Sequence, residues 1–174
     1  AALSRWREGA AARIGYDDSA YAASEYAWTR SCHVVALAWL WDELLFDHDA
    51  GRFTPERFCA ESKREFGGFD GIVLWHAYPV IGIDDRNQFD YYRDVPGIRD
   101  LVAELQARGL RVFVNYNPWD VGTRREPVAD DLAIAELVRE LGVDGVFLDT
   151  MKEAQPGLRA ALDAVKPGIA LEGE

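Results

Sequence analysis

Short apolar runs separated by amphipathic stretches recur along most of the chain. Four of these runs include a glycine at or near their start, and they occupy residues 68–75, 109–116, 142–149 and 168–172. An earlier run over residues 32–41 fits as the first of the series. The runs begin about 25 to 40 residues apart, which is the spacing of strand–helix units rather than of hairpins. We therefore predict five β-strands with helical connections between them.

The stretches between the runs carry apolar residues at helical spacing, which predicts helices over residues 100–107, 129–141 and 158–165. Thr54 and Pro55 predict the start of a further helix, as an N-cap followed by proline at the first helical position. Three glycines stand where helices are expected to end, because glycine readily adopts the left-handed conformation found there: Gly109, Gly142 and Gly168.

Strands that alternate with helices predict a parallel sheet with right-handed crossovers, buried on both faces because the strands are apolar throughout. Two α/β architectures compete, an open doubly wound sheet and a (β/α)8 TIM barrel. No Gly-x-Gly-x-x-Gly motif follows a strand, which weakens the nucleotide-binding forms of the open sheet. Unusual residues gather instead at the C-terminal ends of the strands, where TIM barrels build their active sites. This favours the barrel.

Five strands are about five-eighths of a barrel that typically needs ~250 residues. The chain begins without methionine and stops at Glu174, directly after an apolar run. We therefore expect a TIM barrel truncated after about five βα strands, in residues 31–174, and inactive as this fragment. Residues 1–30 are expected to be helical or irregular, and either to pack under the barrel or to belong to a preceding domain.

Composition narrows the choice of partners. The chain is 49% hydrophobic and 28% charged, which fits one globular core, and no run approaches the ~18 apolar residues of a membrane span. Asp and Glu total 30 against 19 Lys and Arg, a net charge of −11. Such a charge repels phosphate backbones and anionic lipid surfaces. We therefore expect neither nucleic acid nor a membrane as partner.

Carboxylates follow the last two predicted strands. Asp149 comes directly after Val146-Phe147-Leu148, and its parity matches Phe147. Neighbouring strands lie about 4.8 Å apart, so Asp149 and Glu172 could approach the ~5.5 Å separation of retaining glycosidases. We predict these two as the catalytic pair, with Glu172 preferred to Glu174 because it directly continues the apolar strand. The alternative for Asp149 is the N-cap of the following helix.

Aromatic, amide and imidazole side chains follow the other strands. Pyranose rings stack their C–H faces on aromatic rings, and their hydroxyls pair with carboxylates and amides. The long loop over residues 78–94 is a candidate lid. The predicted substrate-binding residues are Trp41, Trp75, His76, Asn117, Trp119 and Glu174.

At these residues the chain resembles glycoside hydrolases with a (β/α)8 barrel. Residues 142–149 are similar to the fourth strand of the α-galactosidase, α-amylase and endo-α-N-acetylgalactosaminidase type, and residues 111–119 to the third strand. This resemblance implies that Asp149 is the nucleophile. Residues 171–173 resemble the fifth strand of members whose acid/base is a Glu, which implies that role for Glu172. Phe147 departs from the arginine that α-amylases carry two residues before the nucleophile.

The leading hypothesis is a retaining glycoside hydrolase that acts on an α-linked sugar and needs no metal or other cofactor. A second is a Mg²⁺-dependent enolising barrel, because carboxylates on consecutive strands suit hard cations and His76 could serve as the base. A third is a non-catalytic carbohydrate-binding barrel in which Asp149 only caps a helix.

Overall fold

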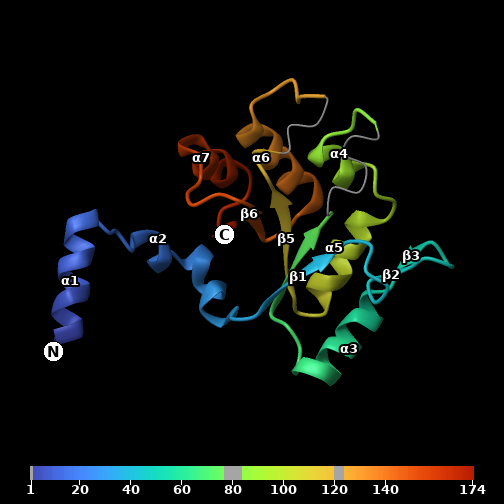
Figure 1. The fold of residues 1–174 in the computed structure, drawn as a ribbon, viewed down its shortest axis with the longest axis horizontal. Helices are drawn as coiled ribbons and strands as arrows, with labels where there is room; N and C mark the ends of the chain where they lie inside the picture. The colour runs from blue at the N-terminus through green and yellow to red at the C-terminus, as the bar shows by residue number, and fades with distance from the viewer. Residues whose placement is uncertain (1, 77–83, 120–123) are drawn as a thin grey trace.

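A five-stranded parallel β-sheet forms the centre of the protein (Figure 1). The computed structural model describes residues 2–76, 84–119 and 124–174. The strands lie in the sheet in their order along the chain: β1 (Val35–Trp39), β4 (Gly71–Trp75), β5 (Arg111–Tyr116), β6 (Gly145–Leu148) and β7 (Ala170–Gly173). All five predicted strands are therefore confirmed, within shorter bounds than the apolar runs.

The sheet formed by the described residues is open, with β1 and β7 as its two edges. The predicted parallel α/β class is confirmed, whereas a closed barrel is not seen. The strand order does not reverse at any point, unlike the order of a doubly wound sheet. When the order does not reverse, right-handed crossovers place every connecting helix on the same face.

Four helices cover that face and lie side by side in chain order (Figure 1). They are α3 (Pro55–Phe66), α5 (Ile98–Ala107), α6 (Asp130–Leu141) and α7 (Pro156–Val165). The bounds of α5, α6 and α7 lie within two residues of the predicted ones, and α3 begins at the predicted Pro55. The predicted lid loop contains a fifth, short helix, α4 (Gln88–Arg93), while residues 78–83 of that loop lie outside the described residues.

The core lies between the sheet and this helix layer. Alternate strand residues point into it, and they are fully or nearly fully buried against apolar residues of the helices. The strand residues are Ala38, Ile72, Leu74, Val112, Val114, Tyr116, Val146 and Leu148, and the helix residues include Leu101, Leu105, Ile134, Leu137, Leu158 and Leu162. The opposite residues of each strand therefore point away from the helices.

Local chemistry sets the helix ends. Thr54 and Pro55 stand at the N-cap and first position of α3 as predicted, but Thr54 makes no side-chain cap. Its hydroxyl donates instead to the carbonyl of Leu44, 3.1 Å away, and so ties the helix to the preceding hairpin of β2 (Phe46–Asp47) and β3 (Arg52–Phe53). Gly142 ends α6 with φ 71°, a conformation that L side chains rarely adopt.

The N-terminal segment divides into two parts. Its 3-10 helix, η1 (Ser24–Ser31), packs against the edge at which the strands begin. There Trp28 meets the ring of Phe113 edge-on and donates its indole N–H to the carbonyl of Gly168, 3.2 Å away. The Arg111 guanidinium lies 4.8 Å from the Trp28 ring centre. These contacts place this part of the segment against the sheet.

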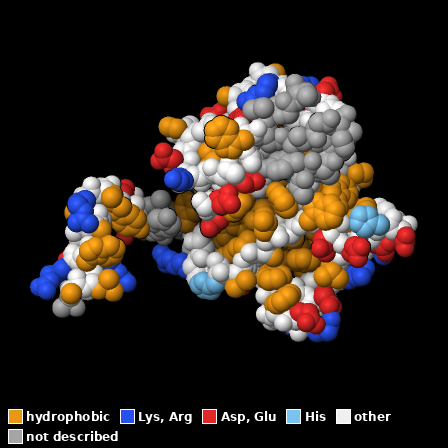
Figure 2. Space-filling model, in the orientation of Figure 1, with side chains coloured by type: hydrophobic (Ala, Val, Ile, Leu, Met, Phe, Trp, Pro, Cys, Tyr) orange, Lys and Arg blue, Asp and Glu red, His pale blue; other side chains and the backbone are white. Residues whose placement is uncertain are grey.

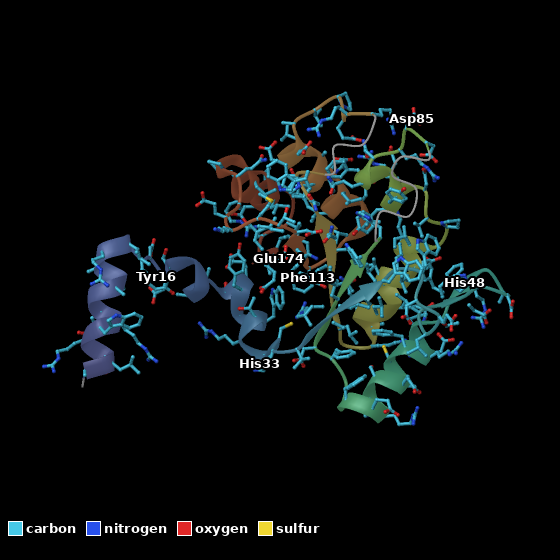
Figure 3. All side chains as sticks on the ribbon, in the orientation of Figure 1. Tyr16, His33, His48, Asp85, Phe113 and Glu174 are labelled. Atoms are coloured by element: carbon cyan, nitrogen blue, oxygen red, sulfur yellow. The ribbon has the colours of Figure 1, made fainter. Side chains whose placement is uncertain are left out.

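The first part stands apart from the sheet. It consists of α1 (Ala2–Ile14) and α2 (Ser19–Ala22), and Figures 1 and 2 show α1 as an arm away from the main body. No described residue of α1 is buried, and Trp6 is 63% exposed. Tyr16, labelled in Figure 3, lies on the same arm. Among the described residues no helix has the length and apolar character needed to cross a bilayer.

Candidate active site

The face of the sheet opposite the four covering helices is called the open face here, and η1 contacts it near the edge at which the strands begin, where Trp28 meets Phe113. The strand side chains that point to it alternate with the core residues, and their register aligns them across the sheet: Val35, Leu37, Trp39, Val73, Trp75, Phe113, Asn115, Phe147 and Glu172. Those of β1 are strongly exposed, with Leu37 at 55% and Trp39 at 45%. Figure 2 shows apolar side chains gathered over this part of the molecule, with acidic groups beside them.

The open face is concave. A hollow of about 380 Å³ is lined by Val35 and Leu37 of β1 and also by Glu172 of β7, the two edge strands of the sheet. Burial raises the pKa of the Cys32 thiol, just before β1, and the charge of Glu172 also contributes to this rise. The hollow therefore extends across the open face from one edge strand to the other.

Asp149 lies at the edge where the strands end, which we call the carboxyl edge. It follows β6 directly, and its backbone N–H donates to the carbonyl of Tyr116, 2.9 Å away. The amide nitrogen of Asn115 lies 3.4 Å from an Asp149 carboxylate oxygen. Since Asn115 belongs to the open face and Asp149 is half-buried, the predicted parity of Asp149 is confirmed.

The two glutamates of the last strand differ in their surroundings. Glu172 is opposite Phe147 in the register, and its exposed side chain lines the hollow. Glu174 lies beyond it, and its carboxylate accepts a 2.7 Å hydrogen bond from the backbone N–H of Thr150. The structure therefore places Asp149 directly after β6 and Glu172 on the neighbouring strand β7, with Glu174 bonded to the residue that follows Asp149.

Two tryptophans stand side by side on the open face at the carboxyl edge. The predicted Trp75 is half-buried, and its register partner on β1 is Trp39. Sequence reasoning missed Trp39 and selected Trp41 instead. The signal that could have found it is parity, because Trp39 shares a face with Leu37 and Val35.

Trp41 lies in a different place. The strand ends at Trp39 and a turn follows, in which the N–H of Asp42 donates to the carbonyl of Trp39. Trp41 then packs edge-on against Phe46 and stacks on Phe53 of the β2–β3 hairpin, with ring centres 5.0 and 6.2 Å apart. It is part of an aromatic cluster that anchors the hairpin.

His76 lies on the helix side of the sheet. It is fully buried, its ring stacks on Tyr91 and meets Tyr92 edge-on, and both tyrosines belong to α4. Burial lowers the pKa of His76 to about 4, although the charge of Asp149 acts in the opposite direction. The imidazole is therefore neutral at pH 7 and packed in the core, close enough to Asp149 to feel its charge.

Asn117 and Trp119 belong to the loop after β5. The Asn117 side chain accepts from the N–H of Trp119, and its backbone N–H and carbonyl both bond the side-chain amide of Gln88. Asn117 is therefore buried in turn and inter-loop contacts, whereas the Trp119 side chain is 76% exposed.

Helix α4 fixes the carboxyl edge from the helix side. The hydroxyl of Tyr92 donates to the carbonyl of Leu74 over 2.6 Å and accepts from the N–H of Asn115 over 2.8 Å, so it joins the ends of β4 and β5. The helix itself is held by ion pairs from Asp90 to Arg93 and Arg124. Tyr92 and Asn115 are supporting residues that sequence reasoning did not identify.

The described residues offer no ready metal site. In residues 2–76, 84–119 and 124–174 no group of three or more His, Cys, Asp or Glu side chains is arranged to hold an ion. The Mg²⁺-dependent alternative therefore gains nothing from the geometry of these residues.

Comparisons with known proteins give no relative. No family model, no curated protein and no solved structure matches the chain. The resemblance to glycoside hydrolases accordingly stays a prediction from the sequence, and function has to be argued from the site.

Proposed function

We propose that this chain is the first five strands of a (β/α)8 barrel and the part of a retaining glycoside hydrolase that carries the catalytic pair, with an α-linked sugar as substrate. Asp149 is the nucleophile and Glu172 the acid/base. The observation that carries the proposal is that Asp149, which contacts Asn115, and Glu172 belong to neighbouring strands and share the open face with Trp39 and Trp75.

The fold argument rests on strand order and curvature. Five parallel strands in unbroken sequence order, with helices on one side, are what a barrel requires. A doubly wound sheet would reverse its order at the switch point and carry helices on both faces. The hollow shared by the edge strands β1 and β7 gives the open face the curvature of a barrel interior.

The site argument rests on the chemistry of glycoside cleavage. In the first step, the Asp149 carboxylate attacks the anomeric carbon while the bond to the leaving oxygen breaks, and Glu172 gives that oxygen its proton. In the second step, Glu172 takes a proton from water, the water oxygen attacks the anomeric carbon, and Asp149 is released. Asn115 orients Asp149, and the indole rings of Trp39 and Trp75 offer stacking surfaces for sugar rings.

The test uses the longest natural polypeptide that contains this sequence, called the parent polypeptide below. We expect it to hydrolyse aryl α-glycosides, and we expect Asp149→Asn to lower turnover by at least about 1,000-fold. Asp100→Asn, an exposed site on α5, is the matched control and should leave turnover unchanged. A cyclitol epoxide, which traps glycosidase nucleophiles covalently, should label Asp149 in a peptide digest. Full turnover in Asp149→Asn, or labelling of another residue, would overturn the assignment.

A carbohydrate-binding protein without turnover is the second candidate. The exposed Trp39 beside Trp75 favours it, because ring stacking alone binds sugars. Binding of an oligosaccharide that persists in Asp149→Ala, together with no turnover on any glycoside, would decide for this candidate.

A further inference from the structure

The turn after β6 contains a strained residue. Thr150 has φ 61° and is the one described residue other than glycine with a positive φ. For a β-branched residue this conformation is a genuine outlier, and such residues persist only where their surroundings hold them. The strained position directly follows Asp149, the proposed nucleophile.

Contacts from the end of β7 hold this turn. The backbone N–H of Thr150 donates to the Glu174 carboxylate, 2.7 Å away. Within the turn itself, the N–H of Met151 donates to the carbonyl of Leu148, the last residue of β6, 3.3 Å away. Gly173 allows the close approach, because a Cβ at that position would lie 3.3 Å from the carbonyl oxygen of Met151. The strand and the turn therefore fit together through Gly173 and Glu174.

The backbone of Asp149 is fixed on both sides as a result. Its own N–H is bonded to the carbonyl of Tyr116 on β5, and the next N–H, that of Thr150, is bonded to Glu174, which directly follows β7. Asn115 then contacts the Asp149 carboxylate from the open face. Loss of the bond to Glu174 would free the turn to relax toward an ordinary φ, and the Asp149 carboxylate would move with it.

We propose that Glu174 is a positioning residue that holds the left-handed Asp149–Thr150 turn, and that the acid/base role belongs to Glu172 alone. This inference rests on the proposed function, and it gives Glu174 a role in the turn in place of the substrate-binding role predicted from the sequence. Glu174 has its carboxylate directed at the backbone of the turn, whereas Glu172 lines the hollow of the open face.

The kinetic test compares variants of the parent polypeptide. Glu174→Ala should lower kcat roughly 10- to 100-fold through misplacement of Asp149, with KM within about twofold and an unchanged pH profile. Glu174→Gln should stay within about threefold of the parent, because an amide oxygen can accept the same N–H. Glu172→Gln, in contrast, should remove the limb of the pH profile that reports the general acid.

A glycine at position 150 gives the sharpest comparison. Thr150→Gly adopts the positive φ without strain, so it should restore most of the kcat lost in Glu174→Ala. A pH profile that changes in Glu174→Gln, or no restoration in the Glu174→Ala, Thr150→Gly pair, would overturn the positioning role.

An activity-independent readout separates this inference from the proposed function. Glu174→Ala should raise the unfolding equilibrium constant several-fold in the parent background and by a smaller factor in the Thr150→Gly background. The Thr150 amide proton should also shift upfield in NMR spectra of Glu174→Ala and remain in place in Glu174→Gln. If both hold and no glycoside is turned over, the proposed function fails while Glu174 keeps its role in the turn. Equal destabilisation in both backgrounds would show that Glu174 does not hold the turn.

Discussion

Carboxylates occupy both ends of the same sheet, and they are used in opposite ways. At the edge where the strands begin, Asp144 is buried and accepts from the side-chain amide of Gln106 and the N–H of Val112, at 2.9 and 3.1 Å. It also pairs with Arg111 and Lys166. Asp144 therefore joins β5 and β6 to the helix layer and has no capacity left for a ligand.

At the carboxyl edge the acidic side chains face outward. Asp149 is half-buried beside Asn115, and Glu172 is exposed on the open face. Both ends carry carboxylates next to apolar strands. Asp144 is buried among donors from β5 and the helix layer, whereas Glu172 is exposed on the open face, and this difference in burial distinguishes a structural tie from a candidate reactive group. Barrel enzymes show the same division between a stabilising end and a catalytic end.

The largest expected effect lies at the structural end. Asp144→Ala removes a buried carboxylate and leaves Arg111 and the N–H of Val112 without their partner, so we expect a loss of about 4 kcal/mol in the free energy of unfolding. Asp149→Ala should cost less than about 1 kcal/mol. Urea unfolding followed by tryptophan fluorescence measures both, and equal losses at the two ends would break the comparison.

A pH effect should come from the buried histidine of the carboxyl edge. The folded pKa of His76, about 4, lies below its unfolded value of 6.5, so the unfolded state takes up the proton first as pH falls. The stabilisation is complete above pH 6.5 and should decline by about 3 kcal/mol between pH 6.5 and 4. His76→Gln should remove this part of the pH dependence, while His33→Gln, at an exposed site, should leave it in place. Parallel curves of unfolding free energy against pH for the parent and His76→Gln would show that His76 does not cause this pH dependence.

The tryptophans near the end of β1 give the next effect. Trp41→Ala should cost about 2 kcal/mol of unfolding free energy, because Trp41 is packed against Phe46 and Phe53. Trp39→Ala should change stability by less than about 0.5 kcal/mol, since the ring is largely exposed, but it should weaken sugar binding. Unfolding curves and sugar titrations on both variants test this, and the reverse pattern would place the sugar surface at Trp41.

The smallest effect is expected at Asp70, where the carboxylate accepts from the N–H groups of His33 and Val34 at 2.8 and 3.0 Å. These bonds lower the pKa of Asp70, so its contribution is present at neutral pH and is lost as pH falls through the folded pKa. Asp70→Ala should destabilise less than Asp144→Ala. Amide exchange at His33 and Val34 should accelerate in the variant, and unchanged exchange would show that Asp70 does not anchor the entry to β1.

The sequence was sufficient for elements that depend on local pattern. The runs at 109–116 and 142–149 form β5 and β6, because a short apolar run that follows a glycine and lies between two helices is typical of a buried strand. The parity of Asp149 followed from the period of two in a strand. The curl of the sheet, in contrast, depends on how β1 and β7 face one another across the hollow, which no single segment encodes.

The errors in the candidate site also have physical causes. Trp41 was selected by its place after an apolar run, but the chain turns at Leu40 and leaves Trp39 as the last residue on the open face. His76 and Asn117 stand at strand ends, yet α4 buries both, and the sequence did not reveal that helix within the long loop. The role of a residue at a strand end can therefore be predicted from the sequence only when the element that follows the strand is also known.

The contact between Trp28 and Gly168 has a consequence for how the chain folds. Each strand of the sheet pairs with its neighbours in sequence, so strand–helix units can assemble one after another as they leave the ribosome. The hydrogen bond from Trp28 to Gly168 instead joins residues 140 positions apart. Until the segment with Gly168 and β7 is synthesised, η1 has the contacts of Trp28 with Phe113 and Arg111 but lacks the hydrogen bond to Gly168. We therefore expect the edge at which the strands begin to be the last part of the described fold to become protected from proteolysis during synthesis.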